Sequence, residues 1–291
     1  MDDRAGCRGG SVPVRQGLWL RARRLRWFVA GYLAVRLLAM IFEESLIFFP
    51  SRWPEGDWRP DNLAVEDAFF SAADGTRLHG WYVDHPSPCA VVLFSHGNAG
   101  NVTDRADWLR MLHQRVGARV MVYDYRGYGR SDGRPDEPGI LADARAARAW
   151  LANRAEVAEQ DIVLMGESLG SAVAVSLAAE DGAAGLALDG AFSSLVDVAA
   201  HHYPLPGLRW FMRTRLDSAA KIGRYRGPLL QSHGQLDTIV PLELGQRLFD
   251  AAGEPKRLIV MPGRDHNDFP PPSYFDELRA WLESLGAPIA G

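Results

Sequence analysis

The five residues at 166–170, Gly-Glu-Ser-Leu-Gly, constrain the fold of this chain more than any other feature. They follow an apolar run at 162–165, which is typical of a short buried strand, and precede a helix-forming run at 171–179. The two glycines allow a cramped backbone and close packing of the helix against the strand. The pattern predicts a strand that passes directly into a helix, with the hydroxyl of Ser168 exposed at the helix N-terminus, where partial positive charge favours an anion.

The chain after Pro50 alternates short apolar runs with helical patterns, which predicts a mainly parallel, twisted sheet with helices on both faces. An Asp-Gly pair at 74–75 predicts an antiparallel hairpin over 68–83 at the start of this sheet. Further strands are expected at 90–95, 119–125, 161–166, 185–189, 228–233 and 257–261. Helices are expected near 102–116, 138–154, 169–180, 242–252 and 273–285. The expected fold class is therefore α/β.

Composition excludes several classes of partner. The 291 residues are 47% hydrophobic, enough for one large core, and the formal net charge of -4 gives no general attraction to nucleic acid. The two cysteines are Cys7 and Cys89, so a disulfide within the folded body and a thiolate metal site are both excluded. We expect no metal and no organic cofactor.

The N-terminal segment differs from the rest of the chain. Seven arginines and two aspartates within 1–26 give this part a charge of +5, while the remaining residues carry -9. An apolar stretch of 16 residues follows at 27–42, with Arg36 inside it, whereas a spanning helix needs about 20 residues. Burying Arg36 costs on the order of 3 kcal/mol, which the apolar neighbours can offset.

We therefore predict two regions, 1–44 with a membrane-anchor helix and 45–291 as the α/β domain. If the helix spans the membrane, the arginines stay cytoplasmic and the α/β domain faces the other side. A helix lying in the headgroup layer and an amphipathic helix packed on the protein itself are the alternatives.

A serine hydroxyl acts as a nucleophile when a neighbouring base takes its proton. We expect such a base for Ser168 at the ends of the strands, where open α/β sheets place their chemistry. His266 follows the last expected strand, in a loop that can carry an imidazole over the sheet. A histidine suits a general base because its ordinary pKa, near 6.5, lets it accept a proton and return it. His96 and His233 also follow strands, but each precedes a glycine and is interpreted as organising its loop.

An acid that orients the histidine is expected in the same region. Asp237 lies four residues past the strand at 228–233, and the order Ser168, Asp237, His266 is the one expected for this architecture. Asp189, at the end of the preceding strand, is a rival for the same role. Asp124 ends another strand and is interpreted as structural.

An oxyanion hole is predicted where the chain leaves the first buried strand. Residues 96–101, His-Gly-Asn-Ala-Gly-Asn, contain glycines that let backbone N–H groups turn toward a ligand. The backbone N–H groups of Asn98 and Leu169 are expected to bind the developing negative oxygen. A phosphate cradle is the other interpretation of such a loop, but no lysine accompanies it.

Five motifs together resemble the α/β-hydrolase superfamily, and within it the Bem46-like branch of serine hydrolases. They lie at 96–101, 123–129, 166–170, 233–241 and 263–268. The resemblance implies an α/β-hydrolase fold and a Ser168, Asp237, His266 triad that cleaves a carboxylic ester or thioester of a small-molecule or lipid-like acyl substrate. Relatives of this kind often carry one N-terminal membrane helix. Some animal relatives remove fatty acyl groups from protein cysteines, but the cysteine-rich N-terminus of those enzymes is absent here.

Two other functions stay open at this point. A peptidase or amidase of the same fold would use the same residues, and a binding or scaffold protein can retain the triad without turnover. A small cap is expected at about 192–226, where Trp210, Phe211 and Met212 either line an acyl pocket or pack against the core.

Overall fold

A computed structural model describes residues 14–286; the side chains of 14–20, 22, 36 and 38–42 lie outside the description. The chain divides into two compact units, Met1–Glu43 and Glu44–Gly291. The second unit contains the sheet and the candidate site.

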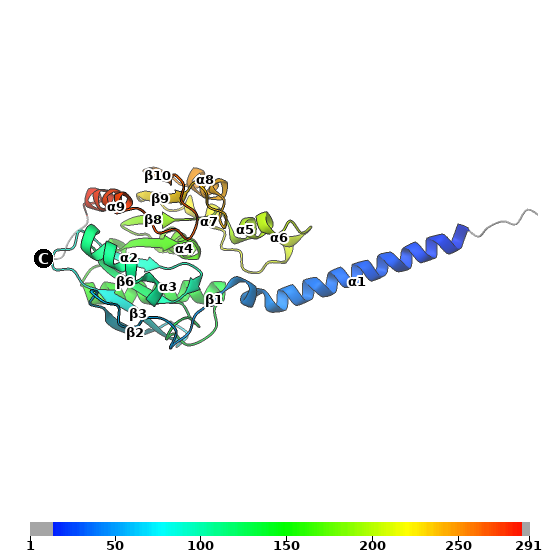
Figure 1. Cartoon of the computed structure of the whole chain (residues 1–291), viewed down its shortest axis with the longest axis horizontal. Coiled ribbons are helices and arrows are strands. Elements are labelled where there is room, and N and C mark those ends of the chain that lie inside the picture. The colour runs from blue at the N-terminus through cyan, green and yellow to red at the C-terminus, as the bar shows by residue number, and fades with distance from the viewer. Residues whose placement is uncertain (1–13, 287–291) are drawn as a thin grey trace, which may run out of the picture. The chain divides into compact units, whose positions relative to one another are not determined.

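The second unit is built around an eight-stranded sheet with the order β10-β9-β8-β7-β4-β6-β3-β2, so that β2 and β10 form its opposite edges (Figure 1). The strands β2 and β3 are antiparallel to each other, β3 is antiparallel to β6, and the other pairs are parallel. The strand bounds are Glu66–Ser71 (β2), Arg77–Val83 (β3), Val91–Ser95 (β4), Arg119–Asp124 (β6), Val163–Glu167 (β7), Gly185–Asp189 (β8), Leu229–Gly234 (β9) and Lys256–Met261 (β10). This arrangement confirms the predicted fold class, including the hairpin at the start of the sheet.

Helices cover both faces because successive residues of the central strands point to opposite sides. In β4, Val91 and Leu93 belong to one buried cluster, while Val92 and Phe94 belong to the other. The first cluster packs under α3, α4, α7 and α8, and the second packs under α2, η2 and α9. The helix bounds are Val102–Arg105 (η1), Ala106–Met111 (α2), Leu112–Val116 (η2), Glu137–Ala155 (α3), Glu159–Asp161 (η3), Leu169–Asp181 (α4), Leu195–His202 (α5), Leu208–Phe211 (α6), Ser218–Ile222 (α7), Leu242–Ala251 (α8) and Pro272–Ser284 (α9).

The predicted cap region, 192–226, contains the three short helices α5, α6 and α7. Ser194 begins α5, because its side chain accepts a hydrogen bond from the Asp197 amide. On the cap side of the sheet, α5 is tied to the loop before α8, since His202 Nε2 lies 2.8 Å from the carbonyl oxygen of Ile239. Figure 1 shows α5 and α6 to one side of the strand ends.

The helix α1, Val14–Ile47, includes the segment 27–42 that was predicted to anchor the protein. Several of its described apolar side chains are exposed, among them Trp27, Phe28 and Val35. Within the described part of the chain, no helix is both long and apolar enough to cross a membrane. The side chains of 36 and 38–42, on which the predicted span depends, lie outside that part.

A second, two-stranded parallel sheet follows α1. Its strands are β1, Phe49–Pro50, and β5, Ala99–Gly100, with Phe49 opposite Ala99 and Pro50 opposite Gly100. The sequence offered no signal for β1, because a strand of two residues has no periodicity. This pairing brings the residues after α1 against the loop that follows β4.

Candidate active site

Ser168 lies between β7 and α4 in a strained backbone conformation, with φ of 50° and ψ of -113°. The residues two positions before and after it, Gly166 and Gly170, leave no room for a side chain because other backbone atoms lie against them. A Cβ atom on Gly170 would lie 1.9 Å from the carbonyl oxygen of Ser95, and one on Gly166 would lie 2.3 Å from that of Gly170. The Ser168 amide donates to the carbonyl of Asp189 over 2.8 Å, which ties the turn to β8. The serine is thus held at the carboxyl end of the sheet.

His266 reaches Ser168 from the loop between β10 and α9. Its Nε2 lies 3.0 Å from Ser168 Oγ, and its Nδ1 lies 2.7 Å from Asp237 Oδ2. Gly190 leaves room for the imidazole, since a Cβ atom there would lie 3.1 Å from His266 Cε1. The structure therefore brings the three residues predicted as a triad into one hydrogen-bonded chain.

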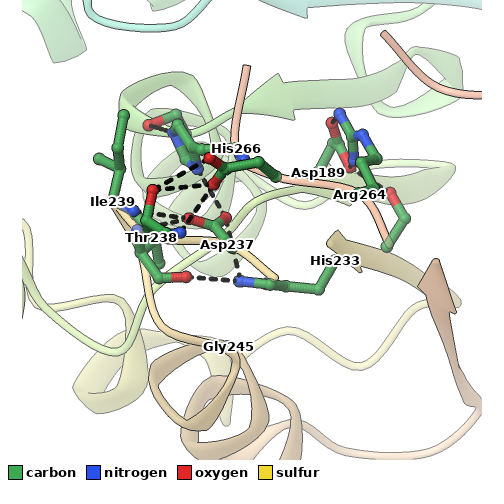
Figure 2. A network of polar contacts seen from close by, with 12 residues as sticks. Asp189, His233, Asp237, Thr238, Ile239, Gly245, Arg264 and His266 are labelled. Carbon is green, nitrogen blue, oxygen red and sulfur yellow. Dashed lines mark hydrogen bonds and ion pairs between the residues drawn. The ribbon is translucent and has the colours of Figure 1, made fainter. Parts of the chain in front are cut away.

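Asp237 is buried at the end of β9 and is surrounded by donors (Figure 2). Its Oδ1 accepts from the amides of Ile239 (3.0 Å) and Val240 (2.6 Å), and its Oδ2 lies 3.3 Å from His233 Nε2. Burial raises the pKa of Asp237, but the hydrogen bonds from His233, His266 and Val240 outweigh burial and hold it well below its usual range. The carboxylate stays ionised and can keep a neighbouring imidazole oriented.

His233 is a partner of Asp237 that the sequence did not indicate. Its Nε2 also lies 2.8 Å from the carbonyl oxygen of Val240, so it organises its loop as predicted and contacts the acid as well. The spacing of four residues between His233 and Asp237 was visible in the sequence. Residues four apart lie side by side in a helix but have no fixed contact in a loop, so the spacing did not predict this pair.

Asp189, the rival acid, is engaged elsewhere. Its two carboxylate oxygens each accept from Arg264 over 2.7 Å, and Ser232 Oγ donates to it over 2.7 Å. Figure 2 shows the Asp189 and Arg264 pair apart from the contacts of Asp237. The bidentate pair directs both carboxylate oxygens toward Arg264, and it is Asp237 that contacts His266 Nδ1.

The loop after β4 carries Asn98, and Leu169 begins α4. Both residues line the same cleft as Ser168 and His266. Among the described residues, the backbone N–H groups of Asn98 and Leu169 donate no hydrogen bond, as expected for Leu169 in the first turn of a helix. Two donors are therefore free to face an anion beside Ser168.

The residues that surround Asn98 are buried and aromatic. His96 is fully buried between the rings of Tyr125 and Tyr128, with centroids 4.6 and 5.6 Å away, and its Nδ1 lies 2.7 Å from the carbonyl oxygen of Gly97. Burial lowers the pKa of His96 to about 3, and the charge of Arg105 adds to this effect. His96 is thus neutral, and its Nδ1 carries the proton that Gly97 accepts.

Asp124, predicted to be structural, is fully buried and accepts from the Val102 amide over 2.9 Å at the start of η1. Its other oxygen lies 3.3 Å from His79 Nδ1. These contacts connect β6 to β3 and to the loop after β4, away from Ser168.

The cleft over Ser168 has a volume of about 600 Å³. Apolar residues from the cap and from its surroundings form much of its wall: Ile47, Phe49, Phe192, Leu195, Val198 and Ile239. Trp210, Phe211 and Met212 do not line it, and the Trp210 side chain is 84% exposed. Of the two roles left open for these three residues, the structure does not support the pocket, and the cap instead contributes Leu195 and Val198 of α5 to the cleft.

The described residues contain no group of three or more histidine, cysteine, aspartate or glutamate side chains that could hold a metal ion. Arg105 and Glu167, which both line the cleft, form an ion pair over 3.1 Å. The arrangement places the Ser168 hydroxyl beside an imidazole that can accept its proton.

Comparisons with known proteins agree with the fold. A family model described as an alpha/beta hydrolase fold matches residues 90–215. An uncharacterized protein of Mycobacterium tuberculosis, Rv2307c, is 43% identical over 228 residues, which cover 78% of this chain and 81% of that protein. Protein bem46 of Schizosaccharomyces pombe is 29% identical over 262 residues, or 84% and 88% of the two chains. The esterase Pf2001 of Pyrococcus furiosus shares the fold, with a TM-score of 0.64 and 20% identity over 81% of this chain and 97% of that one.

Proposed function

This chain belongs to the α/β-hydrolase family, and from that membership we propose that it is a serine hydrolase that cleaves carboxylic esters or thioesters through an acyl-enzyme. One observation carries the proposal: Ser168, His266 and Asp237 form a continuous hydrogen-bonded chain that opens into a cleft. The named esterase of like fold makes an ester the first substrate to test.

In the first step, His266 Nε2 takes the proton of Ser168 Oγ while the oxygen attacks the carbonyl carbon of the substrate. The ionised Asp237 holds the Nδ1 proton and stabilises the imidazolium that forms. The N–H groups of Asn98 and Leu169 receive the negative oxygen, and the N-terminus of α4 adds favourable charge. The imidazolium then protonates the leaving alcohol or thiol.

In the second step, the same groups act on water. His266 removes a proton from a water molecule, which attacks the acyl carbon bound to Ser168, and the same oxyanion donors stabilise the second tetrahedral species. Return of the proton to Ser168 Oγ releases the acid. No step requires a group beyond these side chains and amides.

The experiment that tests this function compares Ser168→Ala, just before α4, with Ser176→Ala within α4. Ser176 Oγ donates to the Ala172 carbonyl and accepts from Lys221 Nζ over 2.9 Å, and Ser176 does not line the cleft, so its loss controls for removal of a buried hydroxyl. We expect a fluorophosphonate probe to label the wild type and Ser176→Ala but not Ser168→Ala. Ester turnover should fall on the order of 10⁶-fold in Ser168→Ala.

Two results would point to the other functions. A folded wild type that neither reacts with the probe nor turns over esters would indicate a binding or scaffold protein. Faster cleavage of amides than of matched esters would indicate a peptidase or amidase.

We further propose that α1 attaches the protein to a membrane. The support is a set of exposed apolar side chains that follow the exposed arginines at 21, 23, 24 and 26: Trp27, Phe28, Val29, Leu33, Val35 and Leu37. Aromatic and aliphatic side chains favour the interfacial and hydrocarbon layers, and the arginines favour anionic headgroups. If α1 crosses the membrane, the arginines remain cytoplasmic and the hydrolase unit lies on the other side.

A further inference from the structure

We propose that the side-chain amide of Asn98 is the positioning group of the oxyanion hole, and that the last residue of α1 and the segment directly after it hold the amide and its loop in place. This inference rests on the proposed function, because it concerns the donor that would bind the oxyanion. Asn98 thereby has two roles, with its backbone N–H facing the substrate and its side chain fixing that N–H.

The side chain of Asn98 is held at both ends. Its Nδ2 donates to the carbonyl of Ile47, the last residue of α1, and its Oδ1 accepts from the Tyr128 hydroxyl over 3.0 Å. Tyr128 is fully buried, and burial raises the pKa of its hydroxyl well above the ordinary value, so the hydroxyl stays a donor. Both polar ends of the amide therefore have fixed partners, and the side chain has one orientation.

The peptide group of Asn98 is fixed from the opposite side. The Gly97 carbonyl and the Asn98 N–H belong to one planar trans unit, so they point in opposite directions. His96 Nδ1 donates to this carbonyl over 2.7 Å, and the His96 ring packs against Tyr125 in a tilted contact and against Tyr128 edge-on. Holding the carbonyl toward His96 turns the N–H of Asn98 away from the buried aromatic cluster, on the side where the cleft lies.

The segment 47–51 secures the rest of the loop. Beyond the pairing of β1 with β5, the Ser51 amide donates to the Gly100 carbonyl over 3.1 Å. Asn101 Nδ2 donates to the Ser51 carbonyl over 3.3 Å. The loop 97–101 therefore lies between the β6 side, which supplies Tyr128, and the segment that follows α1. Ile47 and Phe49 also line the cleft, so this segment contacts both the donor and the substrate space.

The size of the expected effect follows from what the amide does. Loss of a whole oxyanion donor lowers turnover by about 100- to 1,000-fold. Loss of the Asn98 side chain keeps the donor and removes its alignment, so we expect a fall of about 10- to 100-fold in kcat with KM changed by less than about 2-fold. Tyr128→Phe removes one of the two restraints, and we expect a loss of about 3- to 10-fold.

The experiment measures Asn98→Ala, Tyr128→Phe and the double variant in the full-length chain. Tyr225→Phe is the matched control, because the Tyr225 hydroxyl is buried and contacts the carbonyls of Ala183 and Pro228, remote from the cleft. The measurements are kcat and KM for a p-nitrophenyl ester, the affinity for an alkyl boronic acid that mimics the tetrahedral oxyanion, and the thermal midpoint.

The inference predicts that boronate affinity falls in proportion to kcat in Asn98→Ala and Tyr128→Phe. The double variant should lose less than the two single losses multiplied together, since both changes remove the contact between Tyr128 and Asn98. Tyr225→Phe should lose thermal stability alone. If Asn98→Ala does not fold, the Tyr128→Phe and Tyr225→Phe pair decides the question by the same boronate measurement.

Wild-type kcat and boronate affinity in a folded Asn98→Ala would overturn the inference while leaving the hydrolase function intact. Fully additive losses in the double variant would overturn it too. An inactive wild type that binds no boronate would instead remove the proposed function, and the inference with it.

Discussion

At the scale of single residues, Asp237 and Asp189 lie at the ends of neighbouring strands and differ in their partners. Asp237 contacts His266 and is held ionised by several donors, whereas Asp189 accepts hydrogen bonds from Arg264 and Ser232. The partners of each carboxylate therefore separate their expected roles, one in proton transfer and one in holding the loop of Arg264.

We expect Asp237→Asn to lower kcat by about 10⁴-fold, because the imidazole loses its orienting charge. The free energy of unfolding should fall as well, since the folded state holds the pKa of the ionised carboxylate well below its usual range. Asp189→Asn should leave Arg264 without its buried counter-charge and lower the free energy of unfolding by about 3 kcal/mol or more. Ester kinetics combined with urea denaturation on both variants check this. A folded Asp237→Asn with near-normal kcat would contradict the assignment and favour Asp189.

His96 should make the free energy of unfolding depend on pH. Its pKa is about 3 when folded and near 6.5 when unfolded, so below pH 6.5 the unfolded chain binds a proton that the folded chain does not. The free energy of unfolding therefore keeps its full value above pH 6.5 and decreases through this group as the pH falls from 6.5 toward 3. Between pH 6.5 and 4.5 this single group should account for about 2 kcal/mol.

Urea denaturation at pH 7.0, 5.5 and 4.5 of the wild type and His96→Gln measures this contribution. The variant should be less stable at pH 7.0, yet its stability should change less steeply with pH. Equal slopes in the two proteins would show that His96 is protonated in the folded state.

At the scale of secondary-structure elements, α5 forms the cap wall of the cleft while α6 faces solvent. Enlarging a side chain on α5 should therefore shorten the acyl chain that fits. We expect Val198→Trp to move the preferred p-nitrophenyl ester toward shorter chains and to lower kcat/KM for long chains by about 10-fold or more.

Trp210→Ala on α6 is the control, and its chain-length profile should match that of the wild type. The two profiles are measured as kcat/KM over esters from acetate to palmitate. A shift caused by Trp210→Ala, with none from Val198→Trp, would show that Trp210 of α6, and not α5, limits the acyl chain.

The strands and long helices were predictable because each carries a local pattern. In β4, β6 and β7, successive residues alternate between two cores, and the turn at 166–170 requires glycines that are visible in the sequence. The contacts of Asn98 with Ile47 and Tyr128 span 51 and 30 residues and depend on tertiary packing alone. No local pattern encodes them, and the same holds for the choice of α5 over α6 as the wall.

At the scale of the whole molecule, the unit Glu44–Gly291 contains every residue assigned to the site. A protein that begins at residue 44 keeps Ile47 and β1, and we expect it to be soluble and to retain wild-type kcat on short esters. The full chain should sediment with membranes through α1 and resist extraction by high salt. Salt extraction of the full chain would contradict apolar insertion, and membrane sedimentation of the shortened protein would reveal a second attachment.

The connection between Ser168 and His266 has a consequence for how the enzyme is made. Ser168 and the histidine that would activate it are 98 residues apart in the chain. At 5 to 20 residues per second, roughly 5 to 20 s of synthesis separate them. During that time the emerging chain holds its serine without the histidine and the aspartate, so the proposed proton transfer has no acceptor. The proposed site is therefore completed only when the last third of the polypeptide, with Asp237 and His266, has been synthesised.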